Sequence, residues 1–269
     1  FMVFDLLKLE NTDLRSLPSP KWVGQDNYRE LLFDSREFQV ATWNTVKYAL
    51  WLILFLVVCP FLTAFAVTRV SGRAQTFYKS ALFVPTVLSL AVASLIFLWL
   101  YNPIIGVLNG LLTVLGFSPV NWLNEPDWAL FSIVLIVAWK TFGYHFIVLL
   151  AGMLAVPGEI IESTRVEGLR SHWGLLRRFF LPLTGGTLLF VFMMAIVNGV
   201  QYAFVPVHML TNGGPDQQTN HLVFLTYQYG FQFFRSGLAS ATAVLTFLFF
   251  LVLVIIQALF LDRRVHYEN

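Results

Sequence analysis

Five long apolar stretches constrain the fold of this chain more than any other feature of its sequence. They cover residues 46–68, 80–101, 128–150, 183–205 and 238–261. Each is close to the roughly 20 residues that a helix needs to cross a bilayer. The mean hydropathy of +0.70 exceeds what the core of a soluble domain requires. The sequence therefore predicts an all-α integral membrane protein with five full spans.

Charged residues are distributed unevenly among the connections between these spans. Residues 69–79 carry basic side chains without acids, 102–127 carry acids without basic side chains, and 157–182 contain four arginines. Cytoplasmic loops of membrane proteins are enriched in Lys and Arg. We therefore expect the loop 157–182 and the C-terminus to face the cytoplasm, and residues 1–43 to lie outside.

Cysteine and histidine usage limits the chemistry of the chain. The single cysteine, Cys59, lies in the first span, which excludes an intrachain disulfide and a cysteine-based metal site. We expect it to be a small, buried apolar residue. His208 and His221 lack the spacing of metal ligands, so no metal site is predicted. Residues 1–4 are expected to be the end of a helix whose remainder is missing.

The stretch EIIESTRVEGLRSHWGLLRRFFLP, residues 159–182, concentrates charge in an otherwise apolar chain. Pro157 suits the first turn of one helix, Gly168 can end that helix, and Ser171 can cap a second one. The second helix is amphipathic and should end at Leu181-Pro182. One face carries apolar residues and the other arginines: Leu175, Leu176, Phe179 and Phe180 against Arg177 and Arg178.

Two interpretations of this stretch remain. It is either a connector that its arginines hold near anionic lipid, or a docking element for a cytosolic partner. We favour docking, because a plain connector needs neither two helix starts nor a break between them.

Polar residues inside two spans are candidates for a translocation path. Lys140 lies near the middle of the third span and Tyr144 one turn later, and one face of the fourth span carries Asn198, Gln201 and Tyr202. Lys140 either meets an anionic phosphate in a water-filled path, or snorkels or pairs with a carbonyl or a partner's acid. The face of the fourth span either hydrogen-bonds solute hydroxyls or holds helices together.

Several motifs are missing from the sequence. It has no glycine-rich phosphate loop ending in Gly-Lys-Ser or Gly-Lys-Thr, so ATP would be bound by another chain. It has no nucleophile elbow or zinc-protease motif, which disfavours an intramembrane enzyme. None of the predicted spans contains an acidic residue that could serve a proton or sodium relay, which disfavours an ion-coupled transporter.

The charged stretch resembles the signature loop of permease subunits in binding-protein-dependent ABC importers, which reads Glu-Ala-Ala, then Asp-Gly-Ala and, further on, Leu-Pro. The residues that match in kind are Glu162, Glu167, Gly168 and Leu181-Pro182. The three alanines are replaced by Ser163, Thr164 and Leu169, and the spacing to Leu-Pro is one residue longer.

Further segments resemble carbohydrate-class permeases of this family, and they occur in the order found there: WVGQDNYRELL, NTVKYAL, FVPTVLSLAVASLIFLWLYNPIIGVLN and LTNGGPDQQT. The segments AWKTFGYHF and VHYEN are similar to the A-type subunit of sn-glycerol-3-phosphate importers. The fold implied is the transmembrane domain of a type I ABC importer whose first helix is largely missing. It divides the chain into an extracytoplasmic segment 1–43, a transmembrane domain 44–265 with a coupling loop 157–182, and a cytoplasmic tail 266–269.

The resemblance also implies a function and partners. The chain would be the membrane subunit of an ATP-driven importer for a sugar or glycerol-phosphate-type solute, in a bacterial cytoplasmic (inner) membrane. Its partners would be a second homologous permease, two ATPase subunits and an extracytoplasmic solute-binding protein, without nucleic acid. ATP and Mg would be bound by the ATPase, so this chain would carry neither a cofactor nor a catalytic site. The alternative is a standalone ion-coupled secondary transporter or channel subunit.

Two site assignments follow from the resemblance. Docking to the ATPase is assigned to the first half of the charged stretch, with a glutamate as polar anchor and a glycine as bend: Glu159, Glu162, Arg165, Glu167 and Gly168. The outer loop of the family corresponds to Thr211, Gly213, Gly214 and Pro215.

Overall fold

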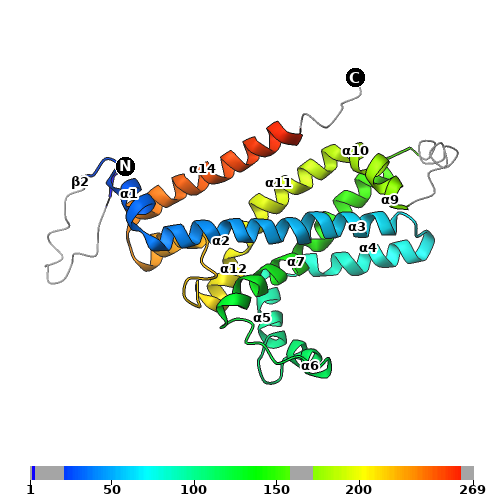
Figure 1. The fold of residues 1–269 in the computed structure, drawn as a ribbon, viewed down its shortest axis with the longest axis horizontal. Helices are drawn as coiled ribbons and strands as arrows, with labels where there is room; N and C mark the ends of the chain where they lie inside the picture. Colours follow the sequence, from blue (N-terminus) through cyan, green and yellow to red (C-terminus); the bar gives the residue numbers. More distant parts are fainter. Residues whose placement is uncertain (1, 4–20, 158–171, 262–269) are drawn as a thin grey trace.

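The computed structural model describes residues 2–3, 21–157 and 172–261, and helices dominate this part of the chain (Figure 1). Four continuous helical segments are long and apolar enough to cross a membrane: Arg36–Val67, Pro126–Leu154, Gly185–Thr211 and Ser236–Gln257. They confirm four of the five predicted spans. The first begins earlier than predicted because Ser35 caps it, with the side-chain oxygen accepting from the backbone N–H of Phe38 at 3.2 Å.

These segments are built from several elements. The first comprises α2 (Arg36–Ile53), η3 (Leu54–Val58) and α3 (Cys59–Val67), and the second is α7 (Pro126–Leu154). The third comprises α11 (Gly185–Tyr202), α12 (Phe204–Pro206) and η5 (Val207–Thr211), and the last is α14 (Ser236–Leu261). Cys59, expected to be buried, is only partly so.

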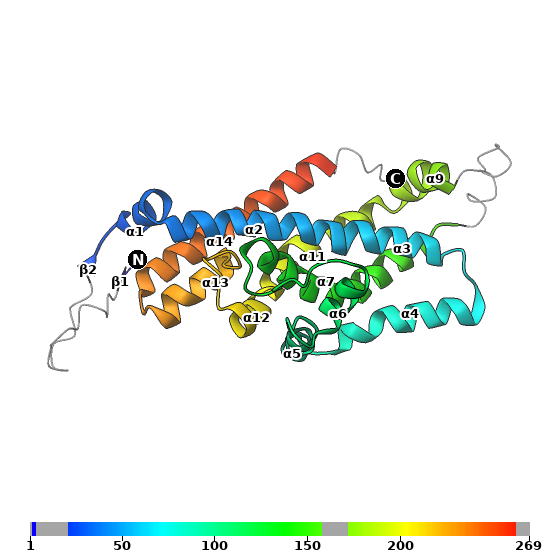
Figure 2. The ribbon, with the colours of Figure 1, turned by 60° about the horizontal axis from the view of Figure 1, so that its bottom comes forward.

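The second predicted span is not a straight helix over 80–101. It consists of α4 (Gly72–Val87) and α5 (Leu90–Leu100), which meet at 99°. Pro85 lies in the last turn of α4, where it removes one backbone donor. Leu88 and Ser89 are extended, and the Ser89 hydroxyl accepts from the N–H of Val92 to cap α5. Counting this bent pair as one span gives the predicted total of five. Figure 2 shows α4 turning back along α3 before the bend.

Shorter elements connect the long ones. Before α2 lie α1 (Asp26–Arg29) and η2 (Glu30–Asp34), and the two-residue strands β1 (Met2–Val3) and β2 (Lys21–Trp22) pair antiparallel. The predicted short helix around 104–115 is α6 (Val107–Val114), and the aromatic segment near 221–235 forms α13 (Leu222–Tyr227) and η6 (Gln228–Gln232). Before α11 stand α9 (His172–Leu175), η4 (Leu176–Phe180) and α10 (Leu181–Leu183).

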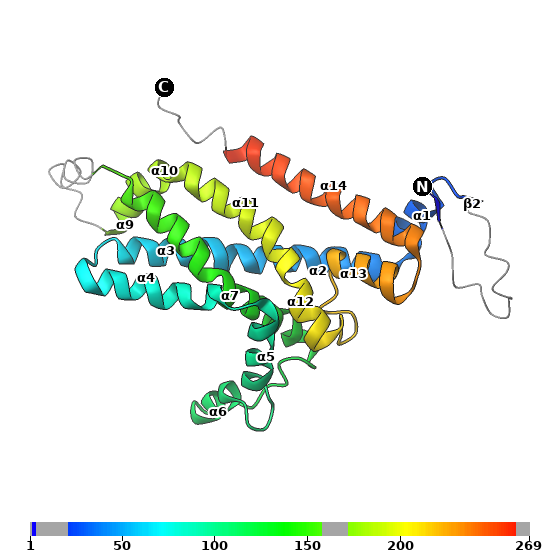
Figure 3. The same cartoon turned by 180° about the vertical axis from the view of Figure 1, so that it is seen from behind.

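Helix α7 is the most buried of the long helices, with 61% of its most apolar window covered by the rest of the chain. It packs against α3, α4 and α11. Small residues permit these close crossings. A Cβ atom on Gly143 would collide with the backbone of Leu82 and Phe83 in α4. At the separate crossing of α11 and α2, a Cβ atom on Gly199 would lie 2.9 Å from the Leu52 side chain. In contrast, only 17% of the α14 window is covered, and α14 diverges from the bundle in Figure 3.

Candidate functional site

Two of the candidate path residues come together where α7 and α11 face each other. Lys140 lies half-way along α7, and its Nζ atom is 5.5 Å from the centre of the Tyr202 ring at the end of α11. A cation within about 6 Å of an aromatic ring is attracted by the ring quadrupole. The structure therefore joins two residues that lie in different predicted spans.

The other candidate path residues flank this contact. Tyr144, one turn after Lys140, and Gln201, beside Tyr202, are both exposed in the isolated chain. Asn198 is half-buried, and its amide donates to the sulfur of Met194 at 3.2 Å. Polar groups thus remain open on the facing surfaces of two membrane-length helices. Such groups are costly against lipid, so this surface suits a solvated path or a polar partner.

The outer loop after η5 is held by its own polar groups. The Thr219 hydroxyl donates to the Gly214 carbonyl at 2.7 Å and lies 2.7 Å from the Thr211 hydroxyl. Gly213 has a φ of +89°, a conformation that favours glycine, and the Gly214–Pro215 peptide is cis. The predicted outer-loop residues therefore form one compact turn.

Three residues of α2 that were not singled out from the sequence anchor this turn. The Asn44 amide donates to the carbonyls of Gln217 at 2.8 Å and Asn220 at 3.0 Å. The Tyr48 hydroxyl donates to the Thr219 carbonyl at 3.2 Å, and the Thr45 hydroxyl accepts from the N–H that opens α13 at 3.1 Å. The signal in the sequence is a polar face at positions i, i+1 and i+4 of an apolar span.

His221, which follows the outer loop, is buried against α2. Its ring is fully buried and packs edge-on against Tyr48, with ring centres 5.4 Å apart. Burial lowers the pKa of His221 to about 3, so the imidazole is neutral at physiological pH. Within the described part of the chain its ring nitrogens form no hydrogen bond of good geometry, although the Ala203 backbone lies near enough to oppose the lowering of the pKa; this agrees with a packing role.

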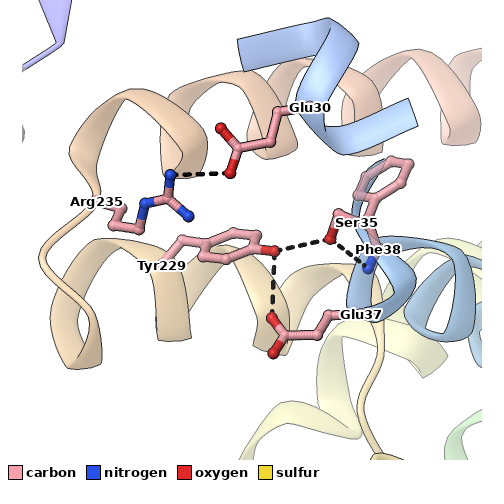
Figure 4. A network of polar contacts seen from close by, with 6 residues as sticks. All are labelled: Glu30, Ser35, Glu37, Phe38, Tyr229 and Arg235. Carbon is pink, nitrogen blue, oxygen red and sulfur yellow. Dashed lines mark hydrogen bonds and ion pairs between the residues drawn. The ribbon is translucent and has the colours of Figure 1, made fainter. Parts of the chain in front are cut away.

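A polar network at the same end ties α2 to the start of α14 (Figure 4). The Tyr229 hydroxyl of η6 donates to a Glu37 carboxylate oxygen at 3.3 Å and lies 3.2 Å from the Ser35 hydroxyl. Arg235 and Glu30 form an ion pair at 2.9 Å. Burial is the main reason that the pKa of Tyr229 is raised, so the phenol stays protonated and able to donate. The sequence analysis did not find this network.

Comparison with known proteins decides what kind of chain carries these features. Residues 51–267 match the family described as binding-protein-dependent transport system inner membrane component. The chain belongs to this family. It is therefore a membrane permease component of a transport system that works with a binding protein, as the resemblance implied.

Individual relatives agree with this assignment. The sulfoquinovosyl glycerol transport system permease of Agrobacterium fabrum is 32% identical over 84% of this chain and 72% of its own length. The arabinooligosaccharides transport system permease of Bacillus subtilis is 28% identical, with 96% and 83% covered. The sn-glycerol-3-phosphate transport system permease of Pectobacterium atrosepticum is 28% identical, with 97% and 86% covered.

A solved structure has the same fold. It is a bacterial ABC transporter involved in the import of the acidic polysaccharide alginate, and a chain in it matches with a TM-score of 0.80 at 24% identity. The match covers 90% of this permease and 84% of that chain. The predicted fold class, an importer transmembrane domain, is confirmed.

The opposite end of the permease carries the charged stretch. The five predicted docking residues, 159–168, lie outside the described residues. The amphipathic helix that follows them is present as α9, η4 and α10, with Leu176 and Phe180 buried and Arg177 and Arg178 exposed, as predicted. It ends at Leu183, one residue beyond Pro182, because proline is tolerated in the first turn of α10. Among the described residues, no cluster of three potential ligands for a metal is found.

Proposed function

We propose that this permease forms half of the translocation path of an ATP-driven importer for a sugar or glycerol-phosphate-type solute, and that Lys140 contacts an anionic group of the solute. The observation that carries the proposal is the Lys140–Tyr202 contact on the open surfaces of α7 and α11. Lys140 forms no ion pair with any residue that the structure describes. Its charge is therefore available to a solute.

The chemistry of the surrounding groups supports a polar, anionic solute. The phenol ring of Tyr202 holds the ammonium group without neutralising it. The amides of Asn198 and Gln201 lie on the same helix face and can bind hydroxyl groups. Two relatives are named for solutes that carry a sulfonate or a phosphate, and the solved transporter imports an acidic polysaccharide.

The other subunits of the importer would be separate chains. One open surface makes half of a path, so a second homologous permease would close it. Residues 159–168 would dock on one of two cytosolic ATPases, with Glu162 as anchor and Gly168 as bend, and those ATPases would bind ATP and Mg. A solute-binding protein would meet the outer loop. The permease would lie in a bacterial cytoplasmic membrane with its C-terminus inside.

Transport by the reconstituted importer tests the role of Lys140. We expect Lys140→Ala to raise KM for a phosphate-bearing solute about tenfold or more, the loss of one charge-assisted contact, and to leave uptake of a neutral sugar nearly unchanged. Lys47→Ala is the matched control. It removes a lysine from another span, where Lys47 lines a surface pocket with Trp51 and Gln218. Equal effects of Lys140→Ala on both solutes would refute the assignment.

Co-purification tests the coupling to an ATPase. We expect the intact importer to carry an ATPase subunit, and Glu162→Lys to abolish ATP-dependent uptake. If no ATPase accompanies the protein and Glu162→Lys transports normally, a standalone ion-coupled transporter or channel becomes the better description.

A further inference from the structure

A small apolar groove opens on the outside of the bundle, away from the candidate path. It has a volume of about 350 Å³. One wall is formed by apolar side chains of η3, α3 and α11, and the other by the amphipathic helix, which contributes Trp173, Arg177 and Leu181. Arg177 is the only charged side chain among the described residues that line it. The groove therefore combines an apolar floor with the guanidinium group of Arg177 at its edge.

The floor of the groove is apolar and exposed. Val58 and Leu62 are 42% and 43% exposed although they belong to a membrane-length helix. They lie nine and five residues before Val67, the end of that helix, which at the rise of an α-helix is about 14 and 8 Å. Trp173 is 66% exposed, and tryptophan is enriched at membrane–water interfaces. The groove thus joins an exposed tryptophan, the type found at interfaces, to exposed apolar side chains of a membrane-length helix.

The charge at this end of the bundle selects the kind of lipid. The neighbouring turn and helix starts carry Arg69, Arg73, Lys79, Arg177 and Arg178, and residues 68–80 and 172–184 contain no acid; the three glutamates of the charged stretch, Glu159, Glu162 and Glu167, lie outside the described residues. Loops of this composition face the cytoplasm, where the leaflet contains anionic lipids that attract basic groups. The guanidinium group of arginine matches the geometry of a phosphate oxygen pair.

We propose that this groove binds an anionic phospholipid, with one acyl chain along the η3 and α3 surface and the headgroup phosphate on Arg177. The lining is apolar apart from Arg177, which suits an acyl chain with a phosphate at its edge. The proposal rests on the orientation of the permease and not on the identity of its solute.

Native mass spectrometry of the assembled importer tests the proposal. The importer, purified through a tag on this full chain, is titrated with phosphatidylglycerol or phosphatidylcholine. We expect the wild type to prefer phosphatidylglycerol, and Arg177→Gln to weaken its binding about tenfold. The matched control is Arg178→Gln, which removes the same charge from an exposed neighbour outside the groove and should bind like the wild type. Leu62→Trp, which fills the floor, should also lose the lipid.

Three outcomes would overturn the site. Equal losses in the Arg177 and Arg178 variants would mean diffuse attraction to the leaflet. Equal binding of the two lipids would remove the role of the headgroup. Failure of Leu62→Trp to assemble, with normal lipid binding by Arg177→Gln, would mean that a protein partner occupies the groove. Because the readout is lipid binding and not uptake, this proposal and the transport proposal can fail separately.

Discussion

The crossing of α4 and α7 at Gly143 gives the sharpest prediction about the fold. A Cβ atom at this position would clash with the carbonyl oxygen of Leu82, and would lie 2.7 Å from the Cα atom of Phe83 and 2.9 Å from Thr86 Oγ1. Carbon atoms in contact are about 3.5–4.0 Å apart. The two helices must therefore separate by about 1 Å to admit a methyl group. Backbone atoms cannot rotate away as a side chain can. The methyl group can therefore be accommodated only if the two helices move apart.

We expect Gly143→Ala to destabilise the permease by about 1–3 kcal/mol, the usual cost of overpacking a tight interior. The matched control is Gly186→Ala at the start of α11, where a Cβ atom would meet nothing within 4 Å. Alanine favours a helix over glycine by about 1 kcal/mol, so the control should be neutral or slightly stabilising.

The assay is thermal unfolding of the detergent-purified importer, followed by loss of its monodisperse size-exclusion peak. For a chain of this size, 1 kcal/mol corresponds to about 2–4 °C, so Gly143→Ala should melt about 2–12 °C below the wild type. Equal melting temperatures for the Gly143 and Gly186 variants would refute the tight crossing. A loss of transport without a loss of stability would instead place the effect on the neighbouring Tyr144.

Three further predictions concern the outer end of the permease. Asn44→Ala removes two hydrogen bonds to the outer loop and should lower its stability by about 1–3 kcal/mol, measured as faster proteolysis of the loop. Thr42→Ala is the control, because its hydroxyl donates to Phe38 of the same helix, and it should leave the rate of proteolysis unchanged. Burial lowers the pKa of His221 to about 3, below the unfolded value of about 6.5. The unfolded chain therefore binds a proton first as the pH drops below about 6.5. The free energy of unfolding should then fall by up to about 1.4 kcal/mol per pH unit. A His221→Phe variant that keeps the same acid sensitivity would contradict this. Arg235→Gln should cost less than about 1 kcal/mol because the arginine and its acidic partner are 37% and 40% exposed; Tyr229→Phe, which loses a partly buried hydrogen bond, should lower the melting temperature more.

The sequence predicted the features that depend on the amount of apolar surface. Four spans are found where the apolar runs lie, because an apolar helix of this length has one favourable environment. The amphipathic helix after residue 171 was also predicted, since its apolar face repeats with the helical period. The Lys140–Tyr202 contact was not predicted as a pair, because it depends on how two spans cross.

Hydropathy could not predict the bend between α4 and α5 or the anchoring of the outer loop. Both sides of the bend are apolar, so the run 80–101 reads as one span although Pro85 and Ser89 divide it. Asn44 and Tyr48 looked like ordinary polar residues near the end of a span. Their partners are backbone carbonyls about 170 residues away, which carry no signature in side-chain sequence.

The two helices that carry the candidate path also begin and end beside the charged stretch. α7 ends at Leu154 and α11 starts at Gly185, so residues 157–182 join them directly. They approach closely near that junction, where a Cβ atom on Gly152 would lie 2.7 Å from Thr187 Oγ1. Lys140 is twelve residues from Gly152, or about 18 Å along α7. A tilt of about 10° between the helices, pivoting at Gly152, would move their far ends apart by about 3 Å over that length. The Lys140–Tyr202 separation of 5.5 Å would then exceed the cation–π range, so this contact is expected to depend on how α7 and α11 cross at Gly152.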